Sequence, residues 1–165
     1  MRSEDLKIME LDGAYSVEVS GRANFDYAVP LRELSGKLTA SGKLQIDLSN
    51  CEAMDSTFMG VLSMLALKLR KRGDRVMLVG ASSTLLKLLR DLGVAKLFNC
   101  VDESDSNGGV RIADGNSAPA SLLTTAETVA EAHKALVSAD ESNAEKFKAV
   151  IDFADQDVAR LKEQQ

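Results

Sequence analysis

Residues 46–62 read IDLSNCEAMDSTFMGVL, and they join the end of an alternating segment to the beginning of a helical one. Up to Leu48, apolar residues alternate with polar ones, which predicts a strand with one apolar face. From Phe58 onward, apolar residues recur at helical spacing, at positions 58, 61, 62, 65 and 69. The hydroxyl residues Ser56 and Thr57 therefore stand where a polar loop turns into a helix.

Similar patterns extend to both sides of this unit. Two alternating segments flank Asp12 and Gly13, which predicts a hairpin with a tight turn. The apolar run 75–80 predicts a central strand. Helices are predicted over 25–38 and 85–92, and a last short strand over 94–101.

The resulting order is strand, strand, helix, strand, helix, strand, helix, strand. It predicts an α/β fold with a mixed four- to five-stranded sheet, because the later strands are joined by parallel crossovers. The second and third strands keep a polar face, so we expect the helices mainly on one face of the sheet. No Gly-rich phosphate loop or nucleophile elbow is present, which argues against a nucleotide-binding or hydrolase fold.

The remaining residues differ in composition from this first module. Residues 1–103 carry equal numbers of acids and bases, whereas all of the net charge lies in residues 104–165. Two stretches of turn and linker residues follow, over 104–109 and 114–119. We therefore predict a domain over 1–103, a linker over 104–119 and a helical extension over 120–165.

Two amphipathic helices are predicted in the extension. The first has apolar residues and one histidine at helical spacing, namely Leu122, Ala126, Val129, His133 and Leu136. The second repeats this rule with Phe147, Val150, Ile151, Ala154, Val158 and Leu161. Such helices need a surface to pack against, and the first module, a second copy of the chain and a partner protein are all open alternatives.

Composition excludes several classes of function. Acidic residues outnumber basic ones by 25 to 20 and aromatic residues make up 4% of the 165 residues, so we expect no nucleic acid partner. The single histidine and two cysteines lack metal-ligand spacing, so neither a metal nor a cofactor is expected. Cys51 and Cys100 are predicted to be buried free thiols. With no apolar signal-peptide run and no stretch of about 18 apolar residues, we expect a cytoplasmic protein that does not insert into membranes.

Residues 6–102 resemble the STAS domain, the family of bacterial anti-sigma factor antagonists and of the cytoplasmic domains of sulphate transporters. The features that carry the resemblance are Asp47-Leu48-Ser49 at the end of a strand, Met54-Asp55-Ser56-Thr57 at the start of a helix, and the later Leu92-Gly93 pair. In that family the second hydroxyl of the pair is phosphorylated by a partner kinase. Thr57 is the matching residue here, and Ser56 is the alternative.

The resemblance implies a role in signal transduction and transcription regulation. The unmodified protein would bind an anti-sigma factor, which frees a sigma factor, and phosphorylation by a serine/threonine kinase would block that binding until a phosphatase reverses it. The implied partner-binding residues are Asn24, Met54, Asp55, Ser56, Thr57, Phe58 and Met59.

Physical chemistry is consistent with such a switch. Free backbone amides and the helix dipole tolerate a phosphate in a first helical turn. The added charge, about −1.5 to −2, would disrupt an interface packed over the same place. Thr57 is expected to be exposed, and so are Met54, Phe58 and Met59, which would supply adaptable apolar contacts. The same residues also have a simpler interpretation, because Asp55 or Ser56 can serve as an ordinary N-cap.

Two positions depart from the family pattern. Phe58 replaces the usual glycine after the hydroxyl pair, where it would either shield Thr57 from a kinase or add a contact to a partner. Asn24 replaces an acid that faces the partner kinase in the family, and Arg22 adds a positive charge beside it. The partner therefore differs from the usual kinase type, or the regulation has been lost.

Three hypotheses follow, and none of them is an enzyme, because no acid and base pair or activated nucleophile can be assembled from the sequence. The first is a phosphorylation-controlled anti-sigma factor antagonist. The second is an unphosphorylated STAS subunit of a membrane transport assembly. The third is a scaffold that forms a homodimer through its helical extension.

Overall fold

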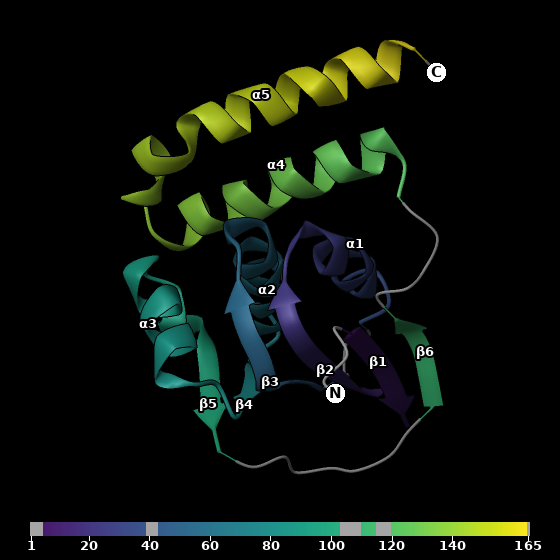
Figure 1. Cartoon of the computed structure of the whole chain (residues 1–165), viewed down its shortest axis with the longest axis vertical. Coiled ribbons are helices and arrows are strands. Elements are labelled where there is room, and N and C mark those ends of the chain that lie inside the picture. Colours follow the sequence, from purple (N-terminus) through teal and green to yellow (C-terminus); the bar gives the residue numbers. More distant parts are fainter. Residues whose placement is uncertain (1–4, 39–42, 103–109, 115–119, 165) are drawn as a thin grey trace.

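The computed structural model of the chain describes residues 5–38, 43–102, 110–114 and 120–164 (Figure 1). Its centre is a mixed six-stranded sheet in the order β5-β4-β3-β2-β1-β6. The strands are β1 (Asp5–Leu11), β2 (Ala14–Ala23), β3 (Leu44–Met54), β4 (Val76–Val79), β5 (Phe98–Val101) and β6 (Val110–Asp114). The helices are α1 (Phe25–Leu34), α2 (Ser56–Arg70), α3 (Ser83–Asp91), the short 3-10 turn η1 (Ala95–Leu97), α4 (Leu122–Ala139) and α5 (Asn143–Glu163).

The N-terminal hairpin forms where the sequence predicts it. β1 and β2 pair antiparallel, and the turn residues Asp12 and Gly13 have φ angles of 51° and 83°. Positive φ at both central residues is the turn geometry whose twist suits a two-residue hairpin. β2, β3, β4 and β5 then pair in parallel, with helices as the crossovers. The predicted mixed α/β sheet is confirmed.

One face of the sheet is covered by helices. Alternate residues of β2 from Tyr15 to Ala23 are buried, whereas Glu18 and Arg22 between them are exposed. The buried face packs with α1 and α2, which lie behind the sheet in Figure 1, around a core whose largest fully buried side chains include Ile46, Leu62 and Leu78. The prediction of helices mainly on one face is therefore confirmed.

Two details of the prediction were wrong. The predicted linker 104–119 contains β6, which pairs antiparallel with β1 and adds a sixth strand at the sheet edge. An edge strand needs only one neighbour and is short, so its sequence signal is weak; the rest of that segment lies outside the described residues. Cys100 is exposed rather than buried because it lies on the four-residue edge strand β5, whereas Cys51 is buried as expected.

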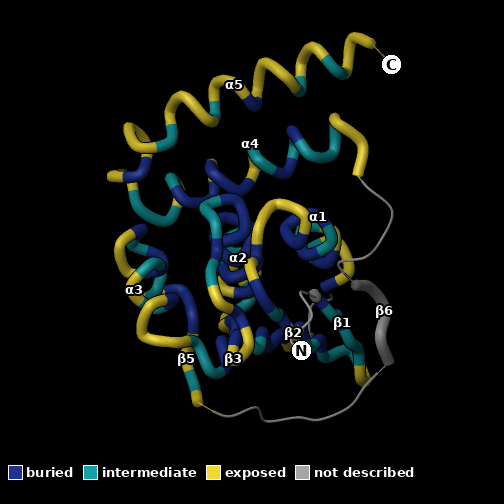
Figure 2. The backbone as a smooth tube through the Cα atoms, in the orientation of Figure 1, coloured by how far each residue is buried: buried dark blue, intermediate teal, exposed yellow. Residues whose placement is uncertain are grey.

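Both helices of the extension form. α5 runs back along α4, and α4 lies at the end of the domain toward which β2 and β3 point (Figure 1). α4 contacts α2, α1 and α5, whereas α5 packs mainly on α4 and leaves its outer side exposed (Figure 2). Of the surfaces that the sequence left open, α4 therefore uses the chain's own domain.

Candidate functional site

The start of α2 is held by Asp55. This residue has extended backbone angles, and its carboxylate accepts a hydrogen bond from the Phe58 amide at 2.8 Å. Its own amide donates to the Ala23 carbonyl at 3.0 Å, which ties the loop after β3 to the end of β2. Asp55 is thus the N-cap, and the cap satisfies one of the amides that every helix start leaves free.

The residues around this cap are buried, which corrects the expectation that they are exposed. Thr57 is 8% exposed, Phe58 0% and Met59 5%, and Met54 at the end of β3 is 7% exposed. Phe58, which stands where the family has glycine, belongs to the core cluster. The physical reason is that α2 has the sheet beneath it and contacts both α1 and α4. Neither Phe58 nor the two methionines offers an exposed apolar contact here.

Ser56 is bonded to the C-terminal extension. Its hydroxyl oxygen lies 2.9 Å from Nε2 of His133, a buried residue of α4. The other ring nitrogen, Nδ1, lies 2.7 Å from the Val129 carbonyl, which can only accept a hydrogen bond. In the neutral ring Nδ1 therefore carries the proton, and Nε2 accepts the hydrogen bond that the Ser56 hydroxyl donates.

α4 approaches the backbone of α2 closely at Gly60. A Cβ atom on Gly60 would lie 2.7 Å from the Cβ of Ala132 and would overlap the Ala132 carbonyl. Gly60 is one helical turn after Ser56, so both face α4 from the same side of α2. Only a glycine on α2 and a small residue on α4 permit this distance.

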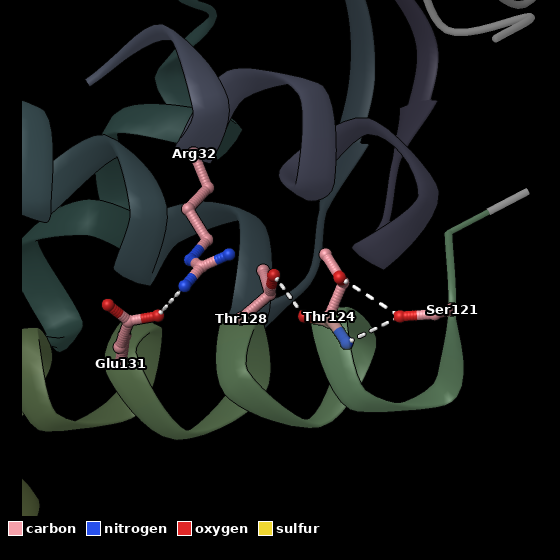
Figure 3. A network of polar contacts seen from close by, with 5 residues as sticks. All are labelled: Arg32, Ser121, Thr124, Thr128 and Glu131. Atoms are coloured by element: carbon pink, nitrogen blue, oxygen red, sulfur yellow. Dashed lines mark hydrogen bonds and ion pairs between the residues drawn. The ribbon is translucent and has the colours of Figure 1, made fainter. Parts of the chain in front are cut away.

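α1 also makes a polar contact with α4, seen in Figure 3. Arg32 extends from α1 and forms an ion pair with Glu131 of α4. One turn earlier on α4, the Thr128 hydroxyl donates to the Thr124 carbonyl at 2.7 Å. Ser121 caps the helix by accepting the Thr124 amide at 3.0 Å. α4 is therefore capped at its N-terminus by Ser121, and its Glu131 pairs with Arg32 of α1.

A second anchor lies at the far end of α4. The side-chain amide of the fully buried Asn143 donates to the carbonyls of Leu92 and Leu136, at 2.8 Å and 2.9 Å. Asp140 lies against Gly93, whose φ of 72° favours glycine. Hydrogen bonds from Ser142 hold the pKa of the Asp140 carboxyl below its usual value. The loop between α4 and α5 is thus fixed to the end of α3.

Comparison with known protein families identifies the domain. Residues 8–99 match the family described as "Mlab, STAS domain". The chain belongs to the STAS family. A comparison with curated protein sequences found no match.

Two solved structures are similar to the STAS domain. A Thermotoga maritima protein, described as a candidate anti-sigma factor antagonist, has a TM-score of 0.50 at 16% identity, covering 59% of this chain and 86% of that one. The unphosphorylated form of the anti-sigma factor antagonist SpoIIAA has a TM-score of 0.47 at 14% identity, covering 60% of this chain and 88% of that one. At this identity the Thermotoga structure supports the fold alone.

Asn24 lies beside the start of α2 but at the surface. It is the N-cap of α1, and its side-chain oxygen accepts the Asp26 amide at 2.9 Å. Its neighbour Ala23 pairs with Met54, so the loops after β2 and β3 of the STAS domain lie side by side. Asn24, Arg22 and the 46% exposed Phe25 are the accessible part of this region. The structure thus brings the predicted site residues together: Asn24 is exposed, Asp55 and Ser56 are half-buried, and the rest are buried, namely Met54, Thr57, Phe58 and Met59.

No metal site accompanies these residues: the described ranges contain no group of three histidine, cysteine or acidic residues that could hold an ion. Burial raises the pKa of the Cys51 thiol to about 11, so this cysteine of the STAS domain is uncharged near neutral pH. None of the helices in the described part of the chain is long and apolar enough to cross a membrane.

Sequence reasoning missed three of the contacts at this site. His133, which was predicted on the apolar stripe of this helix, packs edge-on against Phe147 with 5.0 Å between the ring centroids, but its hydrogen bond to Ser56 was not predicted. The ion pair between Arg32 and Glu131 and the packing on Gly60 were missed as well. These partners are far apart in the chain, and no local pattern links them.

Proposed function

We propose that the chain is a regulatory STAS protein of the partner-switching type, without catalytic activity, in the bacterial cytoplasm. It binds an anti-sigma factor while Thr57 is unmodified. A serine/threonine kinase phosphorylates Thr57 and ends that binding, and a phosphatase restores it. The observation that supports the proposal is the hydroxyl pair in the first turn of α2, directly after the N-cap Asp55, in a domain of the STAS family.

The position of Thr57 suits a phosphate. Thr57 is two residues after the N-cap, within the turn whose amides have no partner in the helix. These amides and the positive end of the helix dipole stabilise negative charge. A phosphate adds about −1.5 to −2 charges with their hydration, so a protein packed on the same turn would be repelled.

Burial of Thr57 adds a condition to the proposal. Thr57 as a whole is only 8% exposed, so the active site of a kinase has little access to it. The helices around the start of α2 must move apart before the residue is modified. α4 is the helix to move, because α1 belongs to the STAS domain itself, whereas α4 lies beyond the matched residues 8–99.

The proposal is tested by incubating the protein with a cognate kinase and ATP and by measuring binding to the anti-sigma factor. We expect one added phosphate, lost in Thr57→Ala, and loss of binding in Thr57→Glu but not in Thr57→Ala. Thr84→Glu is the matched control, because Thr84 occupies the same position in α3 and is exposed. Binding of Thr57→Glu equal to that of the wild type would refute the switch.

The second candidate is an unphosphorylated STAS subunit of a membrane transport assembly. The burial of Thr57 favours it, since a hydroxyl that stays covered is not a kinase substrate. This candidate predicts co-purification with a membrane ATPase or permease, unchanged in Thr57→Ala. The presence of phosphate on Thr57 in protein isolated from cells would count against it.

A homodimeric scaffold is the third candidate, and one surface feature favours it. An apolar groove of about 450 Å³ lies between α4 and α5, and its lining includes Leu122, Val150 and Phe153. Leu122 is 74% exposed and Phe153 68%. Light scattering decides the matter: a dimer that becomes a monomer in Phe153→Asp supports the scaffold, and a monomeric wild type excludes it.

A further inference from the structure

The surface on which α4 packs has three defined contact points. We call it the Gly60 surface, formed by Arg32 of α1 and by Ser56 and Gly60 of α2. Three consecutive residues of α4 meet it, with Glu131 paired to Arg32, Ala132 packed on Gly60, and His133 bonded to Ser56. The Arg32 guanidinium thus faces the Glu131 carboxylate, and the Gly60 backbone faces the small Ala132 side chain. The Ser56 hydroxyl faces the His133 ring, with which it forms a hydrogen bond.

These contacts make the Gly60 surface a site for a helix. Helices approach this closely only where one contributes glycine and the other a small residue. Thr128, Ala132 and Leu136 recur every four residues on α4 and are all buried. They form the buried stripe through which α4 packs on the domain. A helix with the same small-residue stripe, an acid and a hydrogen-bonding side chain would fit equally well.

α4 contributes little to the core beneath this surface. Only Ala132 and Leu136 of α4 belong to the core cluster, whose other members come from the STAS domain before residue 103. The large residues Phe58, Leu62 and Leu65 of α2 belong to the same cluster. Undocking α4 therefore withdraws two side chains, Ala132 and Leu136, from the core cluster and exposes the Gly60 surface.

We infer that α4 is an intramolecular ligand of a helix-binding surface, and that the partner of this domain presents a helix of the same kind and must displace α4. This inference deepens the proposed function, since it names what covers the start of α2 and what kind of protein segment replaces it. Because α4 is tethered, its local concentration is high, and a partner sees only the fraction of molecules that are open.

The experiment measures whether α4, supplied as a separate peptide, binds to the Gly60 surface of the protein. The probe is a fluorescent peptide of residues 121–140, and the proteins are full-length chains. Ala132→Leu enlarges the small residue that faces Gly60 and releases α4 while leaving the Gly60 surface unchanged. Ala149→Leu is the matched control, because Ala149 is exposed on α5. Fluorescence anisotropy measures peptide binding, and hydrogen exchange measures protection of the α4 amides.

We expect the peptide to bind Ala132→Leu at least tenfold more tightly than the wild type or Ala149→Leu. Amides of α4 should lose protection in Ala132→Leu, while those of β2 and β3 keep it. Adding Gly60→Ala to Ala132→Leu should abolish peptide binding, because the new Cβ overlaps the position that Ala132 of the peptide would occupy. Adding Gly36→Ala instead should not, since a Cβ at Gly36 meets only the Glu33 carbonyl at 3.6 Å.

If Ala132→Leu does not fold, the double variant Glu131→Ala/His133→Ala takes its place, because it only removes atoms. The inference is overturned if α4 keeps wild-type protection in the released variants, or if the peptide binds all variants equally or none. No anti-sigma factor or kinase enters this experiment. Failure here therefore leaves the phosphorylation switch intact, and failure of the Thr57→Glu test leaves the helix-binding surface intact.

Discussion

α2 and α3 begin in nearly the same way and end in different surroundings. Each follows a parallel strand, and each has a cap followed by a serine and a threonine. Asp55 caps α2 through the Phe58 amide, and Ser82 caps α3 through the Leu85 amide at 3.2 Å. Yet Thr57 is 8% exposed, whereas Thr84, at the equivalent position, is exposed. Residues close in the chain therefore form the helix start, whereas the elements packed around it decide whether the threonine is accessible.

The largest expected effect is at the third helical position, where both helices bury a large side chain. Phe58 and Leu85 are each 0% exposed. Phe58→Ala should lower the free energy of unfolding by about 3–5 kcal/mol and Leu85→Ala by about 2–5 kcal/mol, through lost burial and a residual cavity. Urea denaturation measures both. A loss below about 1 kcal/mol at Phe58 would mean that this residue is not part of the core.

The threonines should separate the two helices most clearly. Thr57→Glu buries a charge, so we expect it to lower the free energy of unfolding by more than about 2 kcal/mol. Thr84→Glu places its charge near an exposed helix start, where about 0.3–1 kcal/mol of stabilisation is typical. Thermal unfolding of the two variants compares them. Equal effects would contradict the difference in burial on which the comparison rests.

The serines should differ by a smaller amount. Ser56→Ala leaves Nε2 of the buried His133 without its partner, which costs about 1–3 kcal/mol. Ser83 is exposed, so Ser83→Ala should change stability by no more than about 0.5 kcal/mol. The measurement is chemical denaturation, together with hydrogen exchange of the α4 amides. Unchanged α4 protection in Ser56→Ala would show that this bond does not hold α4.

The smallest expected difference is between the caps. Asp55→Ala and Ser82→Ala each remove one bond to a first-turn amide, and each should cost about 1 kcal/mol. Because each cap accepts one first-turn amide, similar losses of stability would show that the two helix starts differ in their surroundings and not in their capping. A loss at Asp55 several times larger than at Ser82 would show that the loop between β3 and α2 carries more than a cap.

Some elements of the fold could be predicted from the sequence and others could not. The hairpin at Asp12 and Gly13 and the capped start at Asp55 were predictable because each depends on residues close in the chain. The strand β6 was not, because Val110–Asp114 pairs only along an edge. The expected exposure of Met54, Phe58 and Met59 was wrong because burial depends on α1 and α4, which pack from distant parts of the chain.

In α4 the hydrophobic pattern predicted only part of the buried surface. The stripe predicted from Leu122, Ala126, Val129, His133 and Leu136 is divided between two surfaces. Leu122, Ala126 and Val129 line the groove beside α5, whereas His133 bonds to Ser56 and Leu136 joins the core of the STAS domain. The buried Thr128 and Ala132 were not part of the predicted stripe, because one is polar and the other is small. A hydrophobic pattern detects large side chains, whereas close helix packing depends on small ones.

The sequence by itself determined the α/β order, the STAS family and the place of the hydroxyl pair, because periodicity, turns and caps act over a few neighbouring residues. Only the tertiary structure decided that Ser56 bonds to His133, that Ala132 rests on Gly60 and that Thr57 is covered. These contacts join residues more than 70 positions apart. They depend on how two surfaces fit in space, and no short-range pattern encodes that fit.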